Sequence, residues 1–339
     1  MPEITVLLVL VIIAALAFDY INGFHDTANA IATVVSTRVL SPTGAILMAA
    51  SLNFIGALMG TGVAKTIASG VIIPELATET VVLSAVIGAI VWNLVTWVYG
   101  LPSSSSHALV GGLIGAGIAK GGINIVTWDK LMDKIVYPIV GSPLAGFILA
   151  FLLMKLIMSV FSHANPGRLS NSFRKLQLIS SAAMALSHGK NDAQKAMGVI
   201  TLALFSHGLI TKAADGEIQV PMWVIIAAAT AMAAGTAAGG WRIMTTMGQK
   251  IIRLEPVHGF AAETAGAAVI FTASLLHMPI STTHAITASI FGVGSSKRLS
   301  AVRWGVAKKV VAAWVITIPA AAAVGAVTFL VLHLIWPNS

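Results

Sequence analysis

Two short polar motifs, each with an aspartate at its centre, interrupt apolar stretches of this chain. They read Gly-Phe-His-Asp-Thr-Ala-Asn-Ala at residues 23–30 and Gly-Lys-Asn-Asp-Ala-Gln-Lys-Ala at residues 189–196. An acid at the centre of a bilayer costs about 2.5–3.5 kcal/mol on insertion scales, so such a residue points to a function. Because Asp26 and Asp192 take equivalent places in the two motifs, we expect both to bind a coupling cation such as Na⁺ or to carry protons.

Other polar side chains of the motifs could support these two carboxylates. His25 directly precedes Asp26, and it is suited to relay protons because an unperturbed imidazole titrates near neutral pH. Asn29 and Asn191 offer amide groups that can donate to an anion or ligate a cation. Lys195 takes the place in the second motif that Asn29 takes in the first, where it could neutralise part of the charge of an anionic substrate.

A proline corner rich in hydroxyl side chains follows each motif further along the chain. Pro102 and Pro279 set the turns, and His107 and His284 stand at matching places after them. The N-terminus of a helix presents free N–H groups and the positive end of the helix dipole, so each corner is suited to bind an anion. Ordinary helix capping would also explain one such corner, but its repetition favours anion binding. The hydroxyl residues of the corners are Ser103, Ser104, Ser105, Ser106, Ser281, Thr282 and Thr283.

The composition indicates an integral membrane protein. Hydrophobic residues make up 57% of the 339 residues and charged residues only 9%, whereas a soluble domain carries about 25% charged residues. The formal net charge of +8 is explained by Lys and Arg in cytoplasmic loops, so it does not indicate nucleic-acid binding. The chain has no cysteine, which excludes disulfides and thiolate metal sites. We expect no cofactor, apart from Na⁺ if that is the coupling ion.

Apolar stretches divide the chain into two similar halves. Residues 1–160 form the first expected transmembrane repeat, 161–175 a basic cytoplasmic linker, and 176–339 the second repeat. Each half has stretches for five crossings, about ten in all, and the basic loops place both termini outside. An odd number of crossings inverts one half relative to the other. We therefore expect an all-α polytopic membrane protein with two inverted-topology repeats.

Two details of the spans are also expected. The segments near 4–36 and 176–206 are longer than a span needs and hold Asp, Asn and Gly at their centres. We expect broken helices there, buried in protein or lining a wet cavity. The stretches 81–101 and 103–120 are either two crossings or a re-entrant hairpin whose tip reaches the midplane, and the sequence leaves both open.

The paired motifs and corners resemble the inorganic phosphate transporter (PiT) family, whose signature Gly-Ala-Asn-Asp-Val-Ala-Asn-Ala recurs in two inverted halves. The resemblance extends over nearly the whole chain and is strongest to the bacterial low-affinity phosphate transporters. It implies a symporter, in the cell (inner) membrane, that imports inorganic phosphate with H⁺ or Na⁺ by alternating access, within a homodimer. It also implies that Asp26, Asn29, Asn191, Asp192 and the two corners surround the substrate and ions. With Lys195 added for its charge, we expect phosphate to bind at Asn29, Asn191, Lys195 and the hydroxyl groups of the corners.

The sequence departs from the family pattern in several places. His25 stands where the signature has Asn, and Lys195 replaces the second Asn of the second motif. A glutamate of Na⁺-coupled relatives corresponds to Asn53, whereas its partner in the second half is retained as Glu263. Losing one carboxylate and gaining a histidine weakens a two-carboxylate sodium site and favours proton coupling. The residues expected at the coupling ion are Asp26, Asp192, Glu263, His25 and Asn53, with Asp26 and Asp192 as ligands if the ion is Na⁺.

Other functions compete with phosphate symport. A protein of the same fold could carry sulfate or a metal–phosphate complex, although only phosphate among the two oxyanions keeps a proton at neutral pH to donate to a carboxylate. A passive anion channel would ignore cation gradients. An intramembrane protease could use the two aspartates, or Ser281 with His284, as its catalytic groups. The symmetric recurrence of Ser and His argues against an enzyme, because catalysis does not require it.

Overall fold

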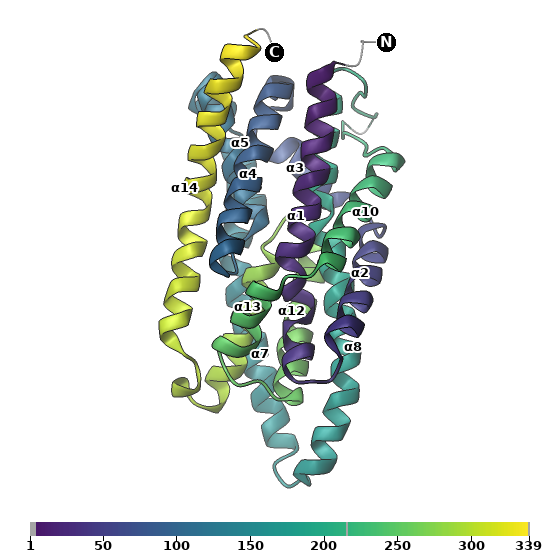
Figure 1. The fold of residues 1–339 in the computed structure, drawn as a ribbon, viewed down its shortest axis with the longest axis vertical. Helices are drawn as coiled ribbons and strands as arrows, with labels where there is room; N and C mark the ends of the chain where they lie inside the picture. The colour runs from purple at the N-terminus through teal and green to yellow at the C-terminus, as the bar shows by residue number, and fades with distance from the viewer. Residues whose placement is uncertain (1–4, 215, 338–339) are drawn as a thin grey trace.

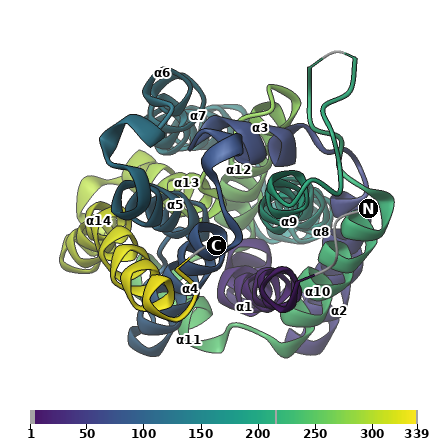
Figure 2. The same ribbon diagram turned by 90° about the horizontal axis from the view of Figure 1, so that it is seen from above.

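The structure is a computed structural model that describes residues 5–214 and 216–337, and it is built from helices (Figures 1 and 2). Within these ranges there is no strand, only two isolated bridges. The outer ends of the expected repeats, residues 1–4 and 338–339, lie outside the described residues. The first half contains α1 (Val6–Ser36), α2 (Pro42–Ala57), α3 (Gly62–Gly70), η1 (Pro74–Leu76), α4 (Glu79–Tyr99), α5 (Ser105–Gly121), η2 (Ile123–Ile125), α6 (Trp128–Leu131), η3 (Met132–Val136) and α7 (Tyr137–Val160). The second half contains α8 (Pro166–Asp192), α9 (Gln194–Ser206), α10 (Met222–Ala238), α11 (Trp241–Thr245), η4 (Thr246–Lys250), α12 (Pro256–Leu275), α13 (Thr282–Lys297), η5 (Leu299–Ala301) and α14 (Trp304–Ile335).

The first polar motif lies within one continuous helix, so the break predicted near 4–36 is wrong. Its side chains do not interrupt the backbone because they find partners beside the helix. The Thr27 hydroxyl, for example, donates to the Thr236 carbonyl oxygen of α10 at 3.3 Å. Gly23 itself allows close packing, since a Cβ there would lie 2.5 Å from the Met232 carbonyl oxygen of α10. A tight crossing of α1 and α10 therefore explains the glycine.

The second motif loosens its helix without breaking it. α8 ends at Asp192, and Ala193 between α8 and α9 keeps helical dihedrals (φ −63°, ψ −24°). The flanking hydrogen bonds are long, at 3.4 Å both from Ala193 N to Gly189 O and from Met197 N to Ala193 O. The broken helix expected near 176–206 is thus a one-residue weak point beside Asp192.

Sharp bends occur at other places in the two halves. α2 and α3 meet at 69°, and α10 meets the α11–η4 stretch at 59°. Gly60 (φ 141°) lies in the first bend and Gly239 (φ 78°) in the second. Glycine adopts positive φ without the steric cost that a Cβ brings, so these two residues allow the helices to turn there.

Two hairpins carry the proline corners. α4 and α5 turn at the first corner, and α12 and α13 turn at the second. In Figure 1, α4 and α5 lie in the half of the molecule that holds both termini, whereas α12 and α13 lie in the other half. α5 packs on α4 and α14, and α13 packs on α12 and α7. Glycines make both packings close, because a Cβ at Gly115 would overlap the Ala322 carbonyl and one at Gly292 would overlap that of Phe147.

The motifs lie between two buried apolar clusters. Along α1, the cluster of the first hairpin ends at Phe18 and the cluster of the second hairpin begins at Ala28. Along α8 and α9, the second cluster ends at Ala185 and the first begins at Ala193. Polar side chains therefore form a layer part-way along the molecule, with apolar packing on either side.

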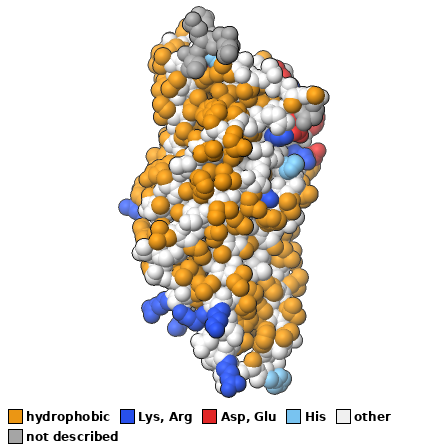
Figure 3. All heavy atoms as spheres, turned by 90° about the vertical axis from the view of Figure 1, so that its right-hand side faces the viewer, with side chains coloured by type: hydrophobic (Ala, Val, Ile, Leu, Met, Phe, Trp, Pro, Cys, Tyr) orange, Lys and Arg blue, Asp and Glu red, His pale blue; other side chains and the backbone are white. Residues whose placement is uncertain are grey.

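The exterior suits a bilayer. Four helical stretches are long and apolar enough to span one, namely α1, α4, Trp128–Val160 and α14, and counting each bent pair as a span gives up to six. The ten crossings expected from the sequence stay a prediction. Figure 3 shows a face largely covered by hydrophobic side chains, with Lys and Arg gathered towards the lower end.

Candidate functional site

The two proline corners meet in the interior of the molecule. The Ser106 hydroxyl of the first corner donates to the Ile280 carbonyl oxygen of the second at 2.8 Å. The His107 and His284 rings pack edge to face at 4.5 Å between centroids. The N-termini of α5 and α13 therefore lie close together, as the anion-binding hypothesis requires.

Each corner uses one of its hydroxyl groups as a helix cap. Ser104 accepts from the His107 N–H at 3.2 Å, and Ser281 accepts from the His284 N–H at 3.1 Å. Capping stabilises a helix by typically about 1 kcal/mol. These two serines thus hold the helix N-termini, which leaves the neighbouring hydroxyl groups to interact with the motifs.

Asp26 is bound by both corners. Its Oδ2 lies 2.9 Å from the Ser105 hydroxyl, and its Oδ1 accepts from Thr283 at 3.4 Å. His25 Nδ1 lies 2.6 Å from the same Oδ1, so the ring donates there. The other ring nitrogen, Nε2, lies 3.1 Å from the Thr96 hydroxyl, and Ser103 donates to Thr96 at 2.7 Å.

Asp192 has a lysine as its closest partner. Lys195 Nζ lies 2.8 Å from Asp192 Oδ2, and the two side chains are 1% and 0% exposed. The ammonium group also donates to the Ser105 hydroxyl at 3.3 Å, while Thr282 donates to Asp192 Oδ2 at 3.3 Å. The lysine therefore links the second motif to the first corner.

Asn29 of the first motif contacts the second corner. Its side-chain amide donates to the Thr283 hydroxyl at 2.8 Å and to Thr282 at 3.3 Å. The structure thus brings together most of the polar residues singled out in the sequence. The residues joined in this central cluster are His25, Asp26, Asn29, Ser103, Ser105, Asp192, Lys195, Thr282 and Thr283.

A cation could bind between the two aspartates. One ligand atom from each of Asp26, His188 and Asp192 falls in a group whose members lie within 4.8 Å of one another. His188 Nε2 lies 3.4 Å from Asp192 Oδ2. Carboxylate oxygens ligate Na⁺-like hard cations, whereas the imidazole makes the group equally suited to a proton.

Two residues that were not expected from the sequence, His188 and Asn22, contact the central cluster. His188 lies four residues before Asp192, one helical turn away, and this spacing could have revealed it. Asn22 lies four residues before Asp26 in the same way, and its Oδ1 contacts the Ser105 hydroxyl. Asp19, three residues before Asn22 on the same helix, is fully buried as well.

Three predicted site residues lie apart from the central contacts. The Asn191 amide donates to Ser274 at 3.0 Å and to the Met278 carbonyl at 3.3 Å. It therefore supports the turn of the second hairpin. Asn53 lies 3.2 Å from His188 Nδ1 and donates to Thr236 at 2.9 Å, so it orients the imidazole.

Glu263, the third of them, has a separate environment. Its Oε1 accepts from Thr33 at 2.5 Å and from Gln177 at 3.0 Å, and the Ser180 hydroxyl donates to Oε2. The side chain is fully buried. No hydrogen bond within the described residues joins this carboxylate to Asp26 or Asp192.

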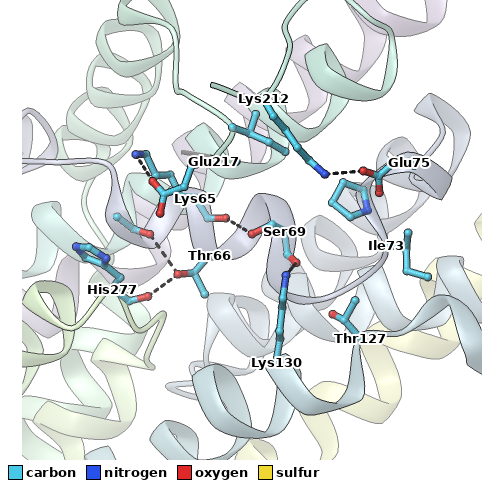
Figure 4. Close-up of a pocket in the computed structure, with 14 residues that line it drawn as sticks. Lys65, Thr66, Ser69, Ile73, Glu75, Thr127, Lys130, Lys212, Glu217 and His277 are labelled. Atoms are coloured by element: carbon cyan, nitrogen blue, oxygen red, sulfur yellow. Dashed lines mark hydrogen bonds and ion pairs between the residues drawn. The ribbon is translucent and has the colours of Figure 1, made fainter. Parts of the chain in front are cut away.

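An open vestibule lies next to the second corner (Figure 4). It is a cavity of about 490 Å³ whose lining includes residues of α3, Lys212, residues 216–218 and His277. Thr66 of α3 donates to the His277 carbonyl at 2.7 Å. Two ion pairs cross the vestibule, Lys65 with Glu217 at 2.5 Å and Lys212 with Glu75 at 2.7 Å. The Lys212 hydrogen bond lowers the pKa of Glu75 below its ordinary value.

The family of the chain follows from comparison with known proteins. The model of the phosphate transporter family matches residues 22–170 and 162–325, so it covers both motifs and both corners. The chain belongs to this family. A probable low-affinity inorganic phosphate transporter of Bacillus subtilis is 46% identical over 99% of this chain and the whole of that relative. One of Rhizobium meliloti is 50% identical over 97% of each.

A solved structure supports the same assignment. "The sodium-dependent phosphate transporter" matches 98% of this chain and the whole of that chain, with a TM-score of 0.89 and 28% identity. The resemblance expected from the motifs is therefore confirmed. The protein is a multi-pass membrane protein of a transporter family, and the prediction of a transporter rather than an enzyme is confirmed by the names of its relatives.

Proposed function

We propose that the protein imports inorganic phosphate by symport with a cation, using alternating access around the central cluster. One observation carries the proposal. The N-termini of two helices from opposite hairpins meet where Asp26 and Asp192 are bonded to the corner hydroxyls Ser105, Thr282 and Thr283. Anion donors and cation ligands are thus interleaved in one buried cluster.

Phosphate would take the place of the Asp26 and Asp192 carboxylates as the acceptor of hydrogen bonds from the two corners. The backbone N–H groups of the helix N-termini, the three hydroxyl groups and Lys195 are all donors that suit a tetrahedral oxyanion. A protonated phosphate oxygen could in turn donate to a carboxylate. At neutral pH sulfate lacks such a proton, so we expect phosphate to be preferred.

Two inverted repeats would give the two faces equal access to the cluster. The helices of the halves correspond in order, with α1 to α8–α9, α2 to α10, α4 to α12, α5 to α13 and α7 to α14. Equivalent helices make equivalent contacts with the opposite half. α5 packs on α14 as α13 packs on α7, and α1 packs on α10 as α8 packs on α2. Transporters built in this way rock one element against another around a fixed site.

Protons are the coupling ion that we favour. His25 and Asp26 form a buried donor–acceptor pair, and Lys195 already supplies a positive charge to Asp192. Both features reduce the need for a metal cation. Na⁺ is the second candidate, supported by the grouping of Asp26, His188 and Asp192 and by the sodium-dependent structural neighbour.

Uptake of labelled phosphate into proteoliposomes tests the proposal. With an inside-alkaline pH gradient and no Na⁺, we expect accumulation above equilibrium, which a protonophore abolishes. Accumulation that needs an inward Na⁺ gradient would instead assign Na⁺, and flux that ignores both gradients would identify a passive pathway. Excess unlabelled sulfate and divalent-metal–phosphate mixtures in parallel assays identify the transported species.

Variants of the acids connect this activity to the cluster. Asp26→Asn and Asp192→Asn should each abolish concentrative uptake, whereas Asp129→Asn, at an exposed site, should retain it. His25→Asn should flatten the pH dependence of uptake while phosphate binding persists. Wild-type accumulation in either aspartate variant would remove that residue from the mechanism.

Assembly and location are further parts of the proposal. We expect a homodimer in the cell membrane, with both termini outside. Chemical crosslinking in native membranes checks the dimer. A single band at the monomer mass under conditions that crosslink a known dimer would contradict it.

A further inference from the structure

A second basic cavity lies at the open end of the second hairpin. It has a volume of about 300 Å³ and lies between the start of α12, the end of α13 and η5. Its charged lining consists of Arg253, Glu255, His258, Lys297, Arg298 and Arg303. Four full positive charges and one carboxylate thus line a space large enough for a small anionic group.

Among the described residues, these four cations have no ion-pair partner. No ion pair or side-chain hydrogen bond joins Arg253, Lys297, Arg298 or Arg303 to any part of the chain that the structure describes. Glu255, the one acid in the lining, caps α12: its carboxylate accepts from the His258 backbone N–H, and the His258 ring accepts from the Glu255 N–H. The acid is therefore engaged with the helix end.

In the vestibule of Figure 4, by contrast, two of the lysines are paired with acids. The cavities have the same local frame, because Thr127 N donates to Val71 O at 3.1 Å in one and Arg303 N donates to Ile251 O at 3.0 Å in the other. In the vestibule, the long α9–α10 connection supplies Glu217 to pair with a lysine. The equivalent α1–α2 connection, 37–41, is short and has no acid.

The cavity also lies where lipid headgroups would be expected. Trp304 is 45% exposed and Leu299 is 67% exposed beside it, and the Trp304 ring N–H donates to the Leu299 carbonyl at 2.9 Å. Exposed tryptophan with a polar tip is typical of the membrane–water interface. Basic pockets between helices at this depth bind phosphate-bearing headgroups.

We propose that this cavity, lined by Arg253, Lys297, Arg298 and Arg303, binds a phosphate-bearing ligand at the base of the α12–α13 hairpin. Guanidinium groups recognise phosphoryl oxygens through paired N–H donors, so a cavity with three arginines suits a phosphate-bearing ligand. The ligand is either the headgroup of an anionic lipid or a soluble phosphate compound. The inference does not depend on which substrate the transporter carries.

Binding by matched variants of the full-length protein tests the proposal. The pocket variant is R253Q/R298Q/R303Q, and the control variant K175Q/K308Q/K309Q removes three charges from exposed residues outside the cavity lining. One arm counts phosphatidylglycerol against phosphatidylcholine bound to purified protein by native mass spectrometry. The other arm titrates inorganic pyrophosphate calorimetrically. Elution as a single gel-filtration peak shows that each variant is folded, and the single variant R298Q provides a milder perturbation.

We expect wild type and the control variant to bind phosphatidylglycerol alike, and the pocket variant to bind it at least about tenfold more weakly. R298Q should fall between them. A loss confined to the pyrophosphate arm would support the same site with a soluble ligand as its source. Equal losses in the pocket and control variants, or no loss in either arm, would overturn the proposal.

Discussion

Lys195 carries its charge into the interior, where its closest partner is a single carboxylate. Replacing it by methionine keeps the volume but leaves Asp192 charged and buried without its cation. Removing one partner of a buried pair costs about 3–5 kcal/mol. We therefore expect Lys195→Met to lower the free energy of unfolding by that amount, measured by denaturation in mixed micelles.

The matching control removes both charges. In Lys195→Met/Asp192→Asn no uncompensated charge remains, so most of the lost stability should return while concentrative uptake does not. Equal destabilisation of the single and double variants would show that Lys195 does not stabilise the protein through its ion pair with Asp192.

Glu263 should affect transport differently from the central aspartates. Its carboxylate is bound by Thr33, Gln177 and Ser180 and does not contact the corners. We expect Glu263→Gln to reduce the maximal uptake rate but to leave the phosphate concentration for half-maximal uptake within about twofold, since uniform binding is unchanged. A large rise in that concentration would place Glu263 at the substrate.

The sequence predicted which residues belong to the site better than it predicted which of them contact one another. The duplicated motif identified Asp26 and Asp192 because an acid is costly to bury in an apolar span, and one that recurs at the same place in both halves indicates a shared task. It could not show that Ser105 contacts both Asp26 and Lys195, because these residues are far apart along the chain. Nor could it separate capping from substrate binding among adjacent corner hydroxyls, since both tasks require the same residue type.

Close packing between helices makes a prediction at the scale of elements. A Cβ at Gly292 of α13 would overlap the Phe147 carbonyl of α7. Backbone cannot move aside as a side chain end can, so Gly292→Ala should destabilise by about 1–3 kcal/mol. Gly141→Ala, within α7 and with nothing within 4 Å of its Cβ, should be neutral or stabilising because alanine favours helix. Similar losses in both variants would refute the packing explanation, as measured by thermal unfolding in detergent.

Helix positions were largely predictable, but their interruptions were not. Apolar stretches expected at 81–101 and 103–120 correspond to α4 and α5 at Glu79–Tyr99 and Ser105–Gly121. Polar residues in the first motif suggested a broken helix, yet α1 is continuous. The reason is that neighbouring helices satisfy these side chains, which a single segment does not reveal.

The vestibule ion pair between Lys212 and Glu75 should respond to pH in one direction. Because the pKa of Glu75 is lowered in the folded protein, its pairing with Lys212 persists above the ordinary value of 4.5 and is lost only as the pH falls below that value. The amide of Ala213, next to Lys212, donates to the Glu217 carbonyl oxygen at 2.9 Å. Its hydrogen exchange, corrected for the intrinsic pH dependence, should therefore stay constant between about pH 8 and pH 5 and rise below. In Glu75→Gln, exchange should be as fast at every pH as it is in the wild type at low pH. Overall stability should change little, because exposed ion pairs contribute at most about 1 kcal/mol.

The orientation of the whole molecule can be tested with single cysteines, because the chain has none of its own. Basic side chains gather at the end opposite the termini (Figures 1 and 3), and such an end faces the cytoplasm. Thr211, beside the vestibule, and Ser162, in the basic linker, are both exposed. In intact cells an impermeant maleimide should label Thr211→Cys at once and Ser162→Cys only after permeabilisation. The reverse pattern would invert the proposed topology.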